Sequence, residues 1–226
     1  MVAAMRLVPD ARTSGFDPLA RVVLEGSGVH SHAETLLHCG GQDMTRDLAD
    51  FVHLLCFLHG RHPTLIETAL TRVKQGPQRD WVLRAGDAFE AERLALVGLV
   101  SQVGPIPSTP GAAATETVVQ AQRHAIETLA ASERDGCALG AAVALVTDWV
   151  PFRALLDMVA ARLSVDVPRR KLPDAAHQEA LVATVDGPGA QRAFNFGLDQ
   201  LLTQHRGLFD LLEARASARN ALDGLA

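Results

Sequence analysis

Five ionisable residues stand at positions that the neighbouring sequence marks as apolar: His59, His62, Glu92, Asp148 and His205. Imidazole nitrogens and carboxylate oxygens bind divalent first-row metals, and Glu and His side chains on facing helices form the di-metal sites of helical bundles. Because a buried charge without a partner is costly, such residues are paired, hydrogen-bonded or bound to a metal. We call them the five candidate residues, and the metal-site hypothesis predicts that they converge.

Helical periodicity places Glu92 and His205 in the middle of apolar stripes. When residues 79–103 and 190–218 are projected at about 100° per residue, Glu92 falls among the apolar residues of the first segment and His205 among those of the second. We therefore expect both side chains to face a shared, dry centre.

The other three candidate residues lie at or near helix ends. His59 and His62 continue the apolar face of a helix expected over 43–59, so the pattern predicts that they point inward or to the edge of the core. Asp148 closely precedes Pro151, which lacks the N–H that a helix needs at that position. A kink is expected there, and kinks often leave a polar group free.

A second hypothesis explains the same residues without a ligand. A histidine on an apolar stripe, such as His205, is commonly hydrogen-bonded to a backbone carbonyl or a carboxylate. Glu92 could pair with an arginine from another helix, and His59 lies near a helix C-terminus, where the dipole favours a cationic imidazole. The Glu-x-x-His spacing of di-metal bundles occurs in none of the expected helices, which counts against the standard version of such a site.

Helical periods recur along most of the chain, and strand signals are nearly absent. We predict an all-α protein, a single-domain antiparallel helical bundle of about seven or eight helices, with a loosely ordered segment at 1–15 and the bundle over 16–226. The three prolines of "GPIPSTPG" (104–111) predict a loop. The glycines of "GCALGAA" (136–142) lie in an apolar helix and indicate close packing against a neighbour. The expected helices cover about 31–39, 43–59, 63–73, 79–103, 113–133, 137–163, 175–185 and 190–218, and 17–25 is a possible further one.

Composition narrows the class of protein. Hydrophobic residues make up 48% of the 226 residues, charged residues 21%, and the net charge is −5. No basic run interleaves with aromatic residues, so we expect no nucleic-acid partner. The apolar stretch 137–147 is too short to span a bilayer, so no membrane is expected either. Three cysteines without a CxxC pattern and no secretory signal indicate a cytoplasmic protein.

Several segments carry a resemblance to known families. The size, the helical layout and the segment "FLHGRHP" resemble the haem-oxygenase-like superfamily, which includes thiaminase II-type proteins and non-haem di-iron oxidases. The helical layout also resembles that of ferritin-like proteins. The phrases "GPIPSTPG", "QRHAIETLA" and "DGCALGAA" resemble an uncharacterised bacterial family. Membership of the superfamily would imply a pocket between helices for a haem, a di-iron centre or a small organic substrate. No ligand residues can be carried across, and the lack of tyrosine departs from the tyrosyl-radical and thiaminase arrangements.

Two functions follow from these hypotheses. We expect a non-catalytic scaffold, or an interaction or small-ligand-binding protein. It would bind a small organic ligand, or a second copy of itself to form a homodimer. The alternative is a metal- or haem-dependent oxidase-like protein, with iron or haem held in the bundle core by His59, His62, Glu92, Asp148 and His205.

Overall fold

The computed structural model describes residues 16–38 and 42–224 of the chain. These residues form ten α-helices and one short 3-10 helix, and they contain no strand, which confirms the predicted all-α class. The segment 1–15, which we expected to be loosely ordered, lies outside the described residues. The elements are α1 (Pro18–Glu25), η1 (Ser27–Val29), α2 (Ser31–His38), α3 (Gln42–His59), α4 (Leu65–Leu70), α5 (Pro77–Val100), α6 (Ala112–Ala130), α7 (Cys137–Thr147), α8 (Trp149–Leu163), α9 (Ala175–Val182) and α10 (Pro188–Asp223).

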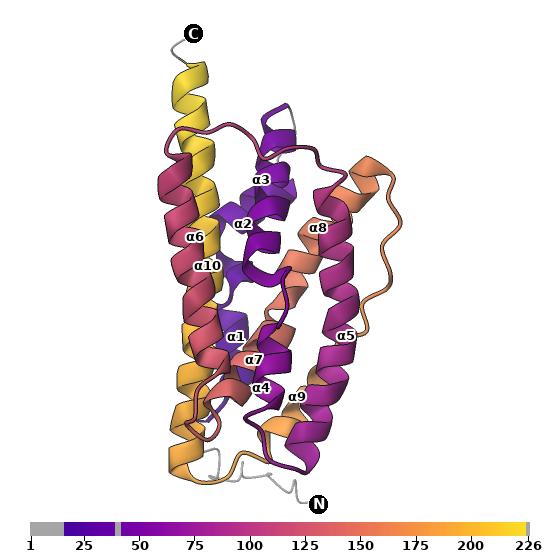
Figure 1. Ribbon diagram of the computed structural model, residues 1–226, viewed down its shortest axis with the longest axis vertical. Helices are drawn as coiled ribbons and strands as arrows, with labels where there is room; N and C mark the ends of the chain where they lie inside the picture. The colour runs from indigo at the N-terminus through magenta and orange to yellow at the C-terminus, as the bar shows by residue number, and fades with distance from the viewer. Residues whose placement is uncertain (1–15, 39–41, 225–226) are drawn as a thin grey trace, which may run out of the picture.

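In Figure 1 the helices α3 and α6 run in the direction opposite to α5, α8 and α10, so α6 is antiparallel to α10 and α3 to α5. The helix α10 extends along one side of the molecule with α6 beside it, and α5 runs along the other side. Between them lie α3, α7 and α8, and the segment 164–174 descends on the outside to α9. The number of helices exceeds the expected seven or eight, partly because the helix expected over 137–163 is divided at Asp148.

Local capping explains where several helices begin. The Thr64 side chain accepts a hydrogen bond from the Glu67 amide, and the Glu67 carboxylate accepts one from the Thr64 amide, so α4 begins with a capping box. Asp174 caps α9 by accepting the His177 amide. Pro77 and Pro188 occupy the first turns of α5 and α10, where a missing N–H costs nothing.

The helices α7 and α10 pack very closely against each other. A Cβ added at Gly140 would overlap the carbonyl oxygen of Phe194, and one added at Gly197 would overlap the carbonyl oxygen of Cys137. The two backbones can approach this closely only because neither glycine has a side chain, which confirms the close packing predicted for Gly140. This contact brings the first third of α10 next to the beginning of α7.

The apolar stretch that runs through α7 and α8 is longer than its first part indicated. By length and composition alone, Cys137–Leu163 is long and apolar enough to cross a membrane, with a mean hydropathy of 1.5 over an apolar stretch of 18 residues. However, 78% of that stretch is buried inside the protein. Its apolar surface is thus used in packing, as expected for a central helix.

Candidate functional site

Three of the five candidate residues form one buried hydrogen-bonded chain. His205 lies in the middle of α10, Asp148 at the joint between α7 and α8, and His59 at the last residue of α3. The Nδ1 atom of His205 lies 2.7 Å from Asp148 Oδ2, and its Nε2 atom lies 3.1 Å from His59 Nε2. None of the three side chains is appreciably exposed. We call this group the histidine pair with its aspartate.

The aspartate is fixed from both sides. Its second oxygen, Oδ1, accepts the backbone N–H of Ser27 at 2.8 Å. A Cβ at Gly26 would come within 2.5 Å of the same oxygen, so the chain at this point has no space for a side chain. Both carboxylate oxygens of Asp148 are therefore occupied by protein donors, and the kink expected near Pro151 has its polar group satisfied.

Hydrogen-bond chemistry assigns part of the proton arrangement. A carboxylate only accepts, so His205 carries a proton on Nδ1 and donates it to Asp148. The two facing Nε2 atoms must consist of one donor and one acceptor. Burial, together with the charges of His205 and Arg123, lowers the pKa of His59 well below the ordinary value of 6.5. His59 is consequently neutral near pH 7, and the pair can hold a single shared proton between its rings.

Space for a reactant beside His59 is very limited. His59 borders a cavity of about 20 Å³ that Arg123 and Thr68 also line. That volume accommodates a single water molecule and no organic substrate. Arg123 is held in place, with Nη1 donating to the Phe57 carbonyl at 3.2 Å. The neutral imidazole thus faces a site that can accept water at most.

Glu92 is buried as predicted, but its partners come from a different group of residues. Its side chain accepts the indole N–H of Trp149 at 3.0 Å and two bonds from Arg153 Nη1 at 2.9 Å. This is the arginine pairing that the second hypothesis foresaw. The Trp149 ring meets the His59 ring edge-on, with centroids 5.7 Å apart. Glu92 and the histidine pair therefore share one core region, connected through an aromatic contact.

His62 is half exposed, so of the two positions expected for it, inward or at the edge of the core, the inward one is wrong. About half of its side chain is exposed, and Nδ1 lies 2.9 Å from the Glu67 carboxylate while Nε2 lies 3.6 Å from that of Glu90. The helical projection fails here because α3 ends at His59 and the chain changes direction before His62. The two carboxylates already have other partners, the Thr64 amide and the Arg93 guanidinium.

The donors for a metal ion are correspondingly sparse. Within residues 16–38 and 42–224, no group of three or more His, Cys, Asp or Glu side chains is arranged to hold a metal ion. The best pair of nitrogen donors is that of His59 and His205, and the nearest carboxylates are engaged with protein donors. The metal site built from all five candidate residues stays a prediction.

A second buried ionic cluster was not predicted from the sequence. Asp50 on α3 is fully buried and accepts Arg215 at 2.8 and 2.7 Å as well as Arg219, both from α10. The same arginines donate to Thr109, which ties the proline-rich loop to the bundle. A signal was present, because Arg215 and Arg219 continue the apolar stripe of α10 at helical spacing beyond Leu212.

The fold and its core define an all-helical bundle protein in which His59, Asp148 and His205 are bonded to one another and Glu92 to Arg153 and Trp149. The chain belongs to a family of unknown function, DUF6975, whose model matches residues 22–220. This confirms the expected membership of an uncharacterised family. In the same comparisons no curated protein and no solved structure matched the chain, so the haem-oxygenase-like resemblance receives no support from them.

Proposed function

We propose that this protein is a non-catalytic, small-ligand-binding helical protein whose buried polar groups serve the fold. The proposal rests on the hydrogen bonds that the two buried carboxylates, Asp148 and Glu92, already accept. Each oxygen of Asp148 and of Glu92 already accepts a hydrogen bond from the protein itself. A general base or a metal ligand needs a lone pair that reaches the reactant or the ion.

The small cavity beside His59 supports the same proposal. A catalytic imidazole must come within hydrogen-bond reach of its substrate, and the space next to this ring is about 20 Å³. Satisfied buried networks of this kind rigidify a core and specify one arrangement of its helices. Asp148, His205 and His59 come from three different segments, so their bonds act on the relative positions of α3, α7, α8 and α10.

The experiment compares Glu92→Gln with the matched control Glu90→Gln. Both residues lie on α5, but Glu92 is buried against Arg153 whereas Glu90 is partly exposed beside Arg93. We expect Glu92→Gln to lower the free energy of unfolding in urea by about 1–3 kcal/mol, because buried donors lose their partner. Glu90→Gln should have a much smaller effect, since exposed pairs contribute little. Equal effects would contradict a structural role for Glu92.

A second candidate function, a metal-dependent oxidase-like protein, has one observation in its favour. The Nε2 atoms of two histidines face each other at 3.1 Å, and Asp148 orients one ring as carboxylates orient metal-bound histidines. The two imidazole nitrogens would be the protein's ligands to the iron. The test is the iron content and visible absorption of protein made in iron-replete medium. Stoichiometric iron that disappears in a folded His205→Ala variant would favour this function over the first.

A further inference from the structure

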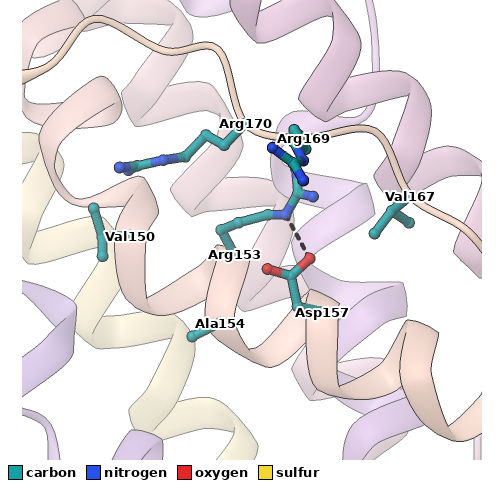
Figure 2. Close-up of a pocket in the computed structure, with 7 residues that line it drawn as sticks. All are labelled: Val150, Arg153, Ala154, Asp157, Val167, Arg169 and Arg170. Atoms are coloured by element: carbon teal, nitrogen blue, oxygen red, sulfur yellow. Dashed lines mark hydrogen bonds and ion pairs between the residues drawn. The ribbon is translucent and has the colours of Figure 1, made fainter.

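An open cleft lies on the outside of the bundle, between α8 and the segment 164–174, with a volume of about 520 Å³ (Figure 2). From α8 it is lined by Val150, Arg153, Ala154 and Asp157. The facing segment contributes Val167, Arg169 and Arg170. Clefts of a few hundred to about 1,000 Å³ are typical of small-molecule sites. The cleft is thus large enough for a small organic molecule, unlike the cavity beside His59.

Arg153 holds the two walls of this cleft together. It is 8% exposed, and four of its guanidinium contacts are taken: two with Glu92, one with Asp157 at 2.8 Å and one with the carbonyl of Pro168. The bond to Pro168 ties the irregular segment to α8 immediately before Arg169. A buried arginine therefore determines where the two following arginines stand.

The charge balance of the cleft is positive. Arg153 pairs with both Asp157 and Glu92, so these three groups together carry one net negative charge, which the two further arginines of the cleft exceed. Arg169 and Arg170 are exposed, and among the described residues neither forms a hydrogen bond or an ion pair. Two guanidinium groups therefore remain available at the rim. Guanidinium groups bind carboxylates and phosphates through paired N–H donors, which favours an oxyanion as the bound group.

Apolar side chains in the cleft indicate that the bound molecule also carries an apolar group. Val150 and Ala154 lie on α8 and Val167 on the facing segment, so the cleft pairs cationic groups with an apolar wall. Val150 is half exposed although it is aliphatic, which leaves apolar surface available to a ligand. We propose that this cleft binds a small organic oxyanion, a phosphate monoester or a carboxylate that carries an apolar group. The inference rests on the proposed binding function and names its site and ligand class.

The test measures binding of phenyl phosphate, hexanoate and inorganic phosphate to the full chain by calorimetry. We expect phenyl phosphate or hexanoate to bind with one site per chain and more tightly than inorganic phosphate, because the apolar wall contributes to affinity. The double variant Arg169→Gln/Arg170→Gln should weaken binding at least about tenfold, which corresponds to the loss of one charge-assisted hydrogen bond of about 1.4 kcal/mol.

The control is the double variant Arg84→Gln/Arg162→Gln. Both residues are exposed, neither lines the cleft, and the net charge changes by the same amount. It should bind phenyl phosphate like the parent. Equal weakening in both double variants would overturn the proposal, because it would indicate only general electrostatic attraction. Absence of binding by either organic anion at millimolar concentration, or equal affinity for inorganic phosphate, would overturn it as well.

The exposed position of the two substituted arginines keeps this test separate from the test of the core. Neither Arg169 nor Arg170 bonds to the buried network among the described residues, so the variants are expected to fold normally. If the cleft binds none of these anions, the unfolding comparison at Glu92 is unaffected. If bound iron is found at the histidine pair, the proposal that the buried polar groups serve only the fold is wrong, while the binding result for the cleft is unaffected.

Discussion

The buried histidine pair predicts a specific dependence of stability on pH. Burial holds the pKa of His59 well below the value of 6.5 that it has in the unfolded chain. Below pH 6.5 the unfolded chain therefore binds a proton that the folded protein does not, and the free energy of unfolding falls as the pH falls. Above pH 6.5 the imidazole is neutral in both states, and this contribution to stability is fully present.

The magnitude follows from the linkage relation. One proton taken up only by the unfolded state changes stability by about 1.36 kcal/mol per pH unit. Between pH 6.5 and 5.0 the loss from His59 alone is therefore up to about 2 kcal/mol. Burial also lowers the pKa of His32, although the charges of Glu213 and Asp47 oppose that effect, so His32 adds a smaller loss of the same sign.

The assay is urea unfolding of the parent protein and of His59→Gln at a series of pH values from 5 to 8. Glutamine keeps a hydrogen-bonding group opposite His205 but cannot titrate, so the difference in stability between the two proteins should shrink as the pH falls. The control variant His124→Gln removes an exposed histidine on α6, whose ring is in water in both states, and should follow the parent. A pH dependence of His59→Gln that parallels the parent over the whole range would refute the reasoning.

Two further predictions concern packing and the second ionic cluster. Gly197→Ala should destabilise the protein by about 3 kcal/mol in urea unfolding, because its Cβ would overlap the Cys137 carbonyl. Gly98→Ala should instead stabilise the protein by about 0.5–1 kcal/mol, because its Cβ would meet no atom within 4 Å. Asp50→Asn should lower the free energy of unfolding by about 3–5 kcal/mol, because two buried arginines lose their counter-charge. A loss no larger than that of Asp135→Asn, whose ion pair is exposed, would contradict this account.

The burial of the candidate residues could be predicted wherever a helix continues on both sides of them. Glu92 and His205 lie several turns from the ends of α5 and α10, so the period of 3.6 residues assigned their orientation correctly. His62 was misassigned because the same projection was extended past the end of α3. Periodicity describes a helix, and it has no meaning for residues that follow the last turn.

The partners of these residues could not be predicted, because they depend on how helices pack. Glu92 bonds to Arg153, which is 61 residues further along the chain, and His205 bonds to Asp148 across 57 residues. The close approach of α7 and α10 at Gly140 and Gly197 sets these two helices against each other, and Asp148 at the end of α7 meets His205 on α10. The glycine pattern indicated a close contact, but it did not indicate the helix on the other side.

Arg153 links the buried core to the proposed cleft, and its bonds decide how a ligand could be recognised. Its guanidinium pairs with Glu92 inside the bundle and with Asp157 outside it, and it donates to the Pro168 carbonyl as well. Drawing this group toward an anion would leave the buried carboxylate of Glu92 with a single donor, the Trp149 indole, which is costly. Arg153 is therefore better suited to position the cleft than to bind its ligand. Recognition of an oxyanion then falls to Arg169 and Arg170, whose side chains can move without disturbing the core.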